Sequence, residues 1–476
     1  MNKHISTRFL LFIIAVIVTP NMTSFAQQKI TLQQAIDSAL ENNLQVKQAQ
    51  FNQAITSEDV NLSKAALLPS ANGSVAGYKL YGNNIDLTTN EFVRSSVTLA
   101  QANLFADVTL FQGLQKLNRI KQNKFYFEAD KNNTQKVRND LTLNVLSTYL
   151  RVLSNRDLLK AAKQQLALAK QQLDREQKFF KVGQKTLADL SQAKAQVANS
   201  EANVTNSQNE MERSYLLLAQ LMERSPGNPF GVVDPGIGEV DNLNTNYTAT
   251  EVYNKALQSF PDIQLVKNQR LASERGVAVA KGVLSPKLSL AGSLNTSYSG
   301  LRKDANTSQI IGNQTVGYIA GSNTPIYAPL YAFQNVSFKD QIDRNFTQAV
   351  GLVLSIPILN GFTGRIGVRK AKLEYQNAQV TEELTKRNIN KVITEAVWDV
   401  QATQKSYKSA ITTFKSTEDA YKVMAQRYTV GLVNSLDVSL SATNRNLAEF
   451  AMIQAKYDLI FKSKLIDYYL GNELKF

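Results

Sequence analysis

Two aspartates have the clearest spacing for chemistry. Asp189 and Asp437 each lie six residues after the glycine of a Val-Gly pair, at Gly183 and Gly431. A Thr or Asn three residues before each aspartate is typical of the capping box that begins a helix. A first-turn carboxylate also attracts cations where several copies of it surround a pore. The spacing therefore fits both a helix cap and the lining of a pore.

Catalytic groups are scarce in the rest of the chain. The sequence has no Cys, and its one His, His4, lies in an N-terminal leader. The mature protein therefore lacks the commonest general base and the commonest zinc ligands. The run from Gly361 to Gly364 is too short for a phosphate-binding loop and lacks its lysine. We predict that the protein is not an enzyme and has no metal site and no cofactor.

The N-terminus is typical of a secretory signal. Lys3 and Arg8 precede an unbroken run of ten apolar residues, 9–18, and Ser24 and Ala26 suit a cut after residue 26. Ten residues are too few to span a bilayer, which needs about 20, so an uncleaved anchor is the weaker alternative. No Cys follows the cut, which excludes lipidation there. We predict a signal peptide over 1–26 and export beyond the inner membrane.

The charge balance is basic, with a formal net charge of +14. Such an excess can indicate a nucleic acid or an acidic lipid as partner. The Lys and Arg residues, however, are scattered along helical stretches, often beside Glu, Asp or Gln. We interpret them mainly as solvated helix surface and expect no nucleic-acid partner.

The mature sequence contains the same order of helical segments, strands and turns twice. We expect a first repeat over 27–222, a linker over 223–246 and a second repeat over 247–476. A constant spacing between matching landmarks is the sign of an internal duplication. The pairs are Pro69 and Pro286 at a shift of 217, and Gly113 and Gly361, Gly183 and Gly431, and Asp189 and Asp437 at a shift of 248.

Each repeat predicts the same order of elements. A helical segment, broken near Asn42 or Pro261, precedes two strands, a very long helix, a Val-Gly turn and a returning helix. The long helices carry apolar residues at every seventh position, which is typical of a coiled coil and also of a soluble helical bundle. The predicted ranges are helices 32–68, 249–284, 114–182, 368–430, 187–222 and 436–470, and strands 74–81, 95–111, 287–298 and 349–359. The heptad positions are Val145, Val152, Leu159, Leu166, Leu173 and Phe180, then Ile393, Val400, Tyr407, Phe414, Tyr421 and Tyr428.

The four predicted strands suit a membrane barrel, although a soluble sheet has the same pattern. They contain about ten residues each and are rich in Gly and Tyr, as transmembrane strands are. Four strands cannot close a barrel, and an open sheet edge is not tolerated in lipid. Two chains would give a filled barrel and three would give an open one. If the strands form a channel, we therefore expect a homotrimer or a larger ring of chains.

These features resemble the TolC-like outer-membrane efflux factor family over nearly all of the mature chain. The resemblance rests on the duplicated plan and on two specific segments. They are Phe180-x-Val182-Gly183-x5-Asp189 and Tyr428-x-Val430-Gly431-x5-Asp437, supported by Pro69, Pro286, Phe111-Gln112-Gly113 and Leu359-Asn360-Gly361.

The resemblance implies a mostly α fold with membrane β: a trimer-shared transmembrane β-barrel with four strands per chain, and a long coiled-coil helical barrel. It implies an outer-membrane location reaching into the periplasm, contact with outer-membrane lipid, and partners in a periplasmic adaptor and an inner-membrane pump. The chain would be the passive export duct of a tripartite efflux or type I secretion system. The alternative class is the coiled-coil adaptor itself, which should have one helical hairpin rather than two.

The resemblance also implies a periplasmic gate at the Val-Gly turns. Asp437 would line the constricted entrance, with Tyr428 and Gly431 beside it. The equivalent residues of the first repeat are Phe180, Gly183 and Asp189, and for Asp189 we favour the capping role. The family's second acid, one turn after the first, is replaced here by Leu440.

Two segments depart from the family pattern. The connection over 301–344 is long and contains Tyr318, Tyr327, Tyr331 and Phe333, so we expect either an enlarged extracellular lid or additional strand. The chain ends at Phe476, soon after the last helix, which predicts a small equatorial belt around 225–246 and the chain ends.

Overall fold

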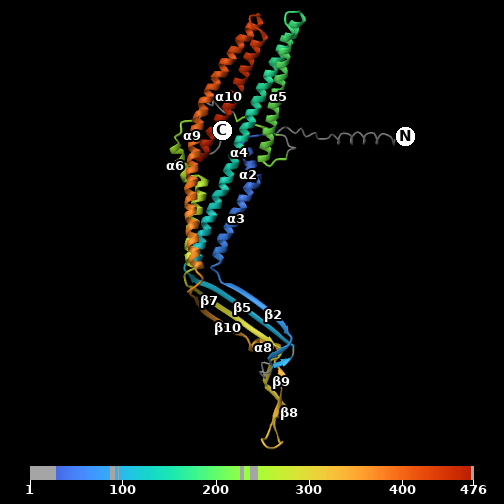
Figure 1. Ribbon diagram of the computed structural model, residues 1–476, viewed down its shortest axis with the longest axis vertical. Helices are drawn as coiled ribbons and strands as arrows, with labels where there is room; N and C mark the ends of the chain where they lie inside the picture. The colour runs from blue at the N-terminus through green and yellow to red at the C-terminus, as the bar shows by residue number, and fades with distance from the viewer. Residues whose placement is uncertain (1–27, 86–91, 95, 226–229, 236–244, 473–476) are drawn as a thin grey trace, which may run out of the picture. The chain divides into compact units, whose positions relative to one another are not determined.

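The computed structural model describes residues 28–85, 92–94, 96–225, 230–235 and 245–472 (Figure 1). The predicted signal peptide, 1–26, and parts of the predicted linker lie outside the described residues. The chain forms two compact units. Unit 1 contains the described parts of 28–53, 130–265 and 383–472, and unit 2 contains those of 54–129 and 266–382. Among the described residues, no helix has an apolar stretch long enough to cross a membrane.

The first helical segment of each repeat is broken where the sequence predicts. Helix α2 (Leu32–Asn42) gives way to α3 (Leu44–Ala65), and α6 (Ala249–Ser259) gives way to α7 (Pro261–Gly282). Asn43 makes the first break, because its side-chain oxygen accepts a hydrogen bond of 2.9 Å from the backbone N–H of Gln45. Pro261 makes the second, because proline at the first position of a helix requires no N–H partner.

The long helices are equal in length. Helices α4 (Gln115–Lys181) and α9 (Thr363–Thr429) contain 67 residues each. Each is followed by a returning helix, α5 (Leu187–Leu221) or α10 (Ser435–Leu470). Helix α9 begins five residues before the predicted start at residue 368, so that boundary is wrong. Glycine at position 364 leaves room for the Leu284 side chain, because a Cβ there would lie 2.6 Å from it.

The predicted heptad stripe is buried along part of its length. Val145, Val152, Ile393 and Val400 are fully buried in unit 1. They belong to a core formed by segments of α4, α9 and α10 together with α2 and α6. At the Val-Gly turns the two stripes differ, because Phe180 is 38 % exposed whereas the equivalent Tyr428 is 5 % exposed.

Unit 2 contains one four-stranded antiparallel sheet, in the order β10-β7-β5-β2 (Figure 1). Its strands are β2 (Ser70–Leu80), β5 (Val97–Gln112), β7 (Lys287–Ser299) and β10 (Thr347–Ser355). These are the four predicted strands, although β10 ends before the predicted 359 because Pro357 has no N–H for a ladder bond. Strands β2 and β10 form the two edges.

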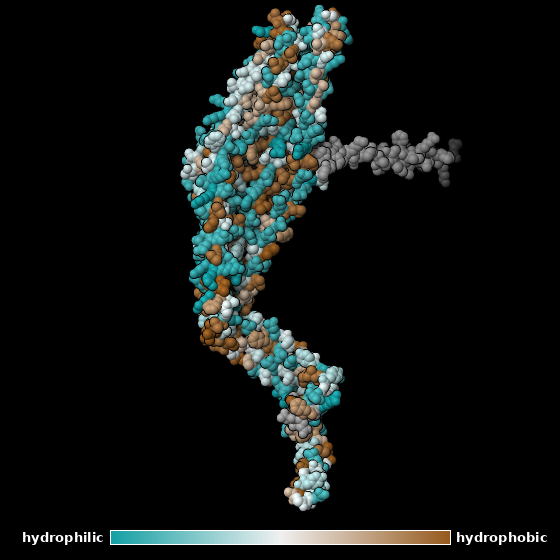
Figure 2. Space-filling model, viewed as in Figure 1, coloured by the Kyte–Doolittle hydropathy of each residue, from teal (hydrophilic) through white to brown (hydrophobic). Residues whose placement is uncertain are grey.

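The register of the sheet repeats the internal duplication. Ser70 pairs with Asp107 in the first repeat, and Thr347 pairs with Asn295 in the second. Shifting β2 by 217 and β5 by 248 reproduces the β7–β10 register, because Ser70 then becomes Lys287 and Asp107 becomes Ser355. The four strand ends that connect to α3, α4, α7 and α9 lie at the same end of the sheet. Brown, apolar side chains gather there in Figure 2.

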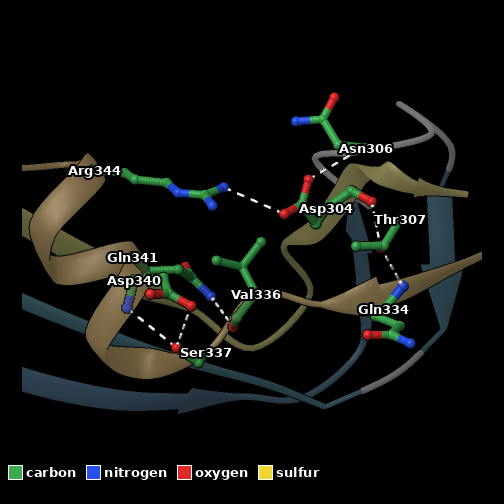
Figure 3. Close-up of polar contacts among 9 residues, drawn as sticks. All are labelled: Asp304, Asn306, Thr307, Gln334, Val336, Ser337, Asp340, Gln341 and Arg344. Atoms are coloured by element: carbon green, nitrogen blue, oxygen red, sulfur yellow. Dashed lines mark hydrogen bonds and ion pairs between the residues drawn. The ribbon is translucent and has the colours of Figure 1, made fainter.

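The long connection over 301–344 contains additional strands. Strands β8 (Lys303–Tyr318) and β9 (Pro325–Asn335) form an antiparallel hairpin, and α8 (Phe338–Arg344) follows it. Gln341 of α8 is 1 % exposed and bonds to the backbone of Ser299 and Val336. Arg344 pairs with Asp304 at 3.4 Å (Figure 3). This polar network fixes the base of the hairpin against the end of β7.

Two short strand pairs complete the described fold. Strands β3 (Asn83–Ile85) and β4 (Phe92–Arg94) form a small antiparallel pair. In unit 1, β1 (Gln28–Ile30) pairs in parallel with β6 (Phe230–Val232), which lies within the predicted linker. The buried Tyr149 hydroxyl of α4 lies 3.0 Å and 2.6 Å from the carbonyl oxygens of Ile30 and Val233. This contact attaches the linker to the long helix.

Candidate functional site

The two Val-Gly turns have the same backbone geometry. At the first, the N–H of Gly183 donates to Phe180 and that of Gln184 donates to Phe179. At the second, Gly431 and Leu432 make the equivalent bonds to the last turn of α9. This is the Schellman motif, which ends a helix with a residue in the left-handed region. Gly183 and Gly431 have φ of 75° and 79°, so glycine is required by conformation.

Both aspartates cap the helix that follows the turn. In α5, Thr186 and Asp189 exchange side-chain to backbone hydrogen bonds of 3.1 and 3.2 Å. In α10, Asn434 and Asp437 do the same at 3.3 and 2.9 Å. The capping boxes predicted from the sequence are therefore confirmed, and each satisfies backbone donors that the helix start leaves free.

The two aspartates differ in their further contacts. Asp189 is half-buried and accepts a 2.9 Å hydrogen bond from the Ser435 hydroxyl at the start of α10. Hydrogen bonds from the Thr186 side chain and backbone, and then from Ser435, hold the pKa of Asp189 below its ordinary value. Asp437 is exposed. Asp189 thus joins two helical hairpins, the first formed by α4 and α5 and the second by α9 and α10, whereas the side chain of Asp437 is exposed to solvent.

Tyr428 is the centre of the contacts between the hairpins. Its side chain is 5 % exposed, and its hydroxyl donates to the Glu176 carboxylate of α4. Arg175 and Lys185 lie over its ring, at 5.2 and 4.7 Å from the centroid. Cations over an aromatic face are attracted by its quadrupole. One aromatic ring of the second repeat is therefore enclosed by three charged groups of the first.

Glu176 is a buried acid that the sequence analysis missed. It is fully buried, and burial raises the pKa of its carboxyl. Gln172 donates to the same oxygen as Tyr428, at 2.7 Å, while the second oxygen has no hydrogen-bond partner among the described residues. Glu176 follows the buried Ala162 and Ala169 at intervals of seven. An acid at a buried heptad position was the signal that could have revealed it.

A cavity of about 270 Å³, lined by both polar and apolar side chains, separates the hairpins next to Tyr428. Five glutamines of the first hairpin contribute to its lining, together with Thr429, Ser435 and Ser439 of the second. Gln165 is 5 % exposed, and its side-chain nitrogen has no partner among the described residues. Besides the bonds of Tyr428 to Glu176 and of Ser435 to Asp189, the Ser439 hydroxyl donates to the Gln196 side chain at 3.2 Å. The hairpins therefore meet through few polar contacts rather than a dry apolar seam.

The second hairpin is held together by its own ion pairs. Arg445 of α10 lies 2.5 Å from Glu418 of α9 and 2.8 Å from Glu449. The hydrogen bond from Arg445 lowers the pKa of Glu418. Helices α9 and α10 are thus joined to each other by strong contacts, while their turn is joined to the first hairpin mainly through Tyr428 and Ser435.

The structure brings some of the predicted site residues together and separates others. Tyr428 and Asp189 both take part in the contacts between hairpins. Gly183 and Gly431 form their turns, and a Cβ added at either position would meet no atom within 4 Å. Phe180 and Asp437 remain exposed on their own helices. Their roles at an entrance stay predictions.

Solved structures share this fold. A CusC structure, described in terms of folding and transmembrane channel formation, is 16 % identical with a TM-score of 0.76, over 93 % of this chain and 92 % of that one. The Campylobacter jejuni CmeC outer membrane channel is 19 % identical with a TM-score of 0.75, over 94 % and 87 %. The Neisseria gonorrhoeae MtrE outer membrane channel, in its open state, is 17 % identical with a TM-score of 0.71, over 93 % and 89 %. The fold is therefore that of outer-membrane channels.

The sequence identifies the family. The model of the outer membrane efflux protein family matches residues 35–223 and 252–472, one match for each repeat. The chain belongs to this family and is an outer-membrane efflux protein. No curated protein sequence matches it. The predicted fold class, duplication, location and efflux role are confirmed, and the adaptor alternative is not supported because the family match spans both repeats.

Proposed function

We propose that three copies of the chain form one passive duct, the outer-membrane component of a tripartite efflux or type I secretion system. The four-stranded sheet with unpaired edges at β2 and β10 carries this proposal. Open edges are not tolerated in lipid, and single-chain barrels begin at about eight strands. Three chains supply twelve strands, enough for an open lumen.

Native mass spectrometry of detergent extracts from outer membranes tests this stoichiometry. We expect the mass of three mature chains, because each β10 edge needs the β2 edge of a neighbour. A sample that contains monomers alone, under conditions that preserve other outer-membrane oligomers, would contradict the proposal.

We propose that the Val-Gly turns face a periplasmic adaptor and, through it, an inner-membrane pump. Exposed apolar side chains gather at both turns, as they do at protein interaction sites. They are Val182, Leu187, Val430, Leu432, Leu436 and Leu440. We also propose that the duct transports its cargo without catalysis, in keeping with the shortage of catalytic groups in the sequence.

The proposed domain boundaries follow the duplication. A signal peptide over 1–26 precedes the repeats over 27–222 and 247–476, and the linker over 223–246 includes β6. The family matches begin and end close to these limits, at 35–223 and 252–472.

We propose that Asp437 lines the entrance of the duct in addition to capping α10. Its exposed carboxylate lies in the first turn of α10, directly after the second Val-Gly turn. Three-fold assembly would convert this charge into a ring of three, whose field is strongest where the lumen is narrow. Phe180 and Gly183 would border the same entrance from the first repeat.

Asp437→Asn separates lining from capping. Asn keeps an oxygen that can accept the Asn434 N–H, so the cap should survive with little change in thermal stability. We expect the Asn variant to lose most of its cation selectivity, measured as reversal potentials of reconstituted channels across a salt gradient.

Asp189→Asn is the matched control at the equivalent position of the first repeat. Its carboxylate is engaged by Thr186 and Ser435, so this variant should keep the reversal potential of the wild type. Identical reversal potentials for wild type and Asp437→Asn would restrict Asp437 to capping.

A further inference from the structure

The net positive charge of the mature chain is concentrated at four helix ends. Removing Lys3 and Arg8 of the leader from 53 basic residues leaves 51, against 39 acidic residues. Twelve of the 51 lie in residues 62–68, 113–125, 275–288 and 361–373, which contain no Asp or Glu. The other 39 balance the acidic residues. We call these twelve the basic belt: Lys64, Lys116, Arg119, Lys121, Lys124, Arg275, Lys281, Lys287, Arg365, Arg369, Lys370 and Lys372.

The fold brings these four segments to one end of one sheet. Helix α3 leads into β2, β5 leads into α4, α7 leads into β7, and β10 leads into α9. Gln112 pairs with Lys287, and Lys287 pairs with Ser355. The helix-linked ends of β5, β7 and β10 therefore lie side by side at the same end of the sheet. The start of β2 pairs with Asp107 of the same end. Charge that looks scattered along the sequence is therefore gathered in space.

Helix stability does not explain the belt. Lys116 and Arg365 lie in the first turns of α4 and α9, where the helix dipole disfavours cations, and six more lie within the first ten residues of these helices. Ion pairing explains little more, because among the belt residues only Lys370 has a described carboxylate within 4 Å, Glu374 at 3.9 Å. Lys116 donates to the carbonyl of Ala66 at the end of α3, at 2.5 Å. Most of the others are exposed.

Exposed apolar residues border the belt on the side of the sheet. Leu68, Leu114, Phe362 and Ile366 each have more than half of their surface exposed. Leu114 and Phe362 have φ of 58° and 63°, an uncommon conformation for residues with a side chain, and occupy equivalent positions in the two repeats. Figure 2 shows brown side chains at this junction beside teal helix surface. An apolar margin next to basic side chains is the arrangement found at a membrane surface.

We propose that the basic belt binds the phosphate groups of anionic phospholipids in the leaflet that faces the periplasm. This rests on the proposed function, in which the sheet spans the outer membrane and the helices leave it on the periplasmic side. Lys and Arg near an anionic membrane surface each contribute a favourable interaction that decays within the Debye length. Binding at this level would fix the depth of the sheet in the bilayer.

The test compares two variants with the same loss of charge. The belt variant carries Arg365→Gln, Arg369→Gln, Lys370→Gln and Lys372→Gln in α9. The control variant carries four exposed changes further along the same helix, Lys405→Gln, Lys408→Gln, Lys415→Gln and Arg427→Gln. Each full-length protein, purified in neutral detergent, is mixed with phosphatidylglycerol, with phosphatidylcholine or with inorganic phosphate. Native mass spectrometry then counts the bound molecules.

We expect wild type and control to retain phosphatidylglycerol in preference to phosphatidylcholine, and the belt variant to lose at least about tenfold of that preference. Equal retention of both lipids by wild type, or equal losses in both variants, would overturn the proposal. Retention of inorganic phosphate without lipid preference would also overturn it and would indicate an anion site instead. The same spectra give the number of chains, so a failure of the proposed trimer is seen separately from a failure of the belt.

Discussion

Replacing Tyr428 with alanine should raise the single-channel conductance of the reconstituted protein severalfold. The ring is enclosed by Glu176, Arg175 and Lys185, and a cavity of about 270 Å³ lies directly beside it. Truncating a buried aromatic side chain costs about 3 kcal/mol or more. A loss of that size shifts an equilibrium between joined and separated hairpins by on the order of 100-fold.

Tyr428→Phe is the matched variant for this prediction. It keeps the ring and both cations over it but removes the hydroxyl that donates to Glu176, so its conductance should lie between wild type and Tyr428→Ala. Planar-bilayer recordings of trimeric protein provide the measurement. A conductance of Tyr428→Ala equal to that of wild type would show that these contacts do not restrict the duct.

Gly113→Ala should destabilise the protein far more than Gly361→Ala, although the two glycines are equivalent in the repeats. Both have positive φ, 53° and 60°, where a side chain costs about 1–2 kcal/mol. At Gly113 an added Cβ would overlap the Ser285 hydroxyl and lie 2.5 Å from the Ser285 Cβ. At Gly361 it would meet nothing within 4 Å. Overpacking adds about 1–3 kcal/mol at Gly113 alone.

Thermal unfolding followed by helical circular dichroism measures this difference. Gly113→Ala should unfold at a clearly lower temperature than Gly361→Ala. Adding Ser285→Gly to Gly113→Ala removes the overlapping atoms and should recover the steric part of the loss. Equal unfolding temperatures for the two single variants would contradict the close approach of the β5–α4 connection to the end of α7.

The sequence predicted the elements well because helix ends have local signals. The absence of Gly and Pro from long stretches predicted α4, and the glycines at 183 and 431 predicted where α4 and α9 end. The capping boxes at Asp189 and Asp437 were equally local. Strand β10 and the start of α9 were placed less well, because Pro357 ends the ladder of β10 and because α9 runs through Gly364 and Gly367, which are unfavourable in a helix interior.

The contacts between hairpins could not be predicted in the same way. Glu176 and Tyr428 are 252 residues apart, and no local pattern pairs them. For the 301–344 connection, the sequence did not distinguish an enlarged lid from additional strand. The bonds of Gln341 to Ser299 and Val336, which hold this connection, are equally non-local. The basic belt escaped notice because four segments, each unremarkable alone, meet only when the sheet forms. The heptad pattern also suggested burial for Phe180, which the structure leaves partly exposed.

In the proposed trimer, the duplication specifies the register in which neighbouring chains would pair. The β10 edge of one chain and the β2 edge of the next are equivalent to β5 and β7 within a chain. In the β5–β7 pair, Phe105 lies opposite Ser293. Applying the shifts of 248 and 217 places Val353 of one chain opposite Ala76 of its neighbour. The chain has no Cys, so an introduced pair is free of background.

Disulfide formation between Ala76→Cys and Val353→Cys therefore tests the shared barrel most directly. In membranes treated with a mild oxidant, the double variant should run on a non-reducing gel as covalent dimers and closed trimers, while each single variant should run as a monomer. The control pair of Ala76→Cys with Thr347→Cys is displaced by six residues, about 20 Å along the strand, and should not cross-link. A double variant that remains monomeric, or links only within its own chain, would contradict a barrel built from several chains.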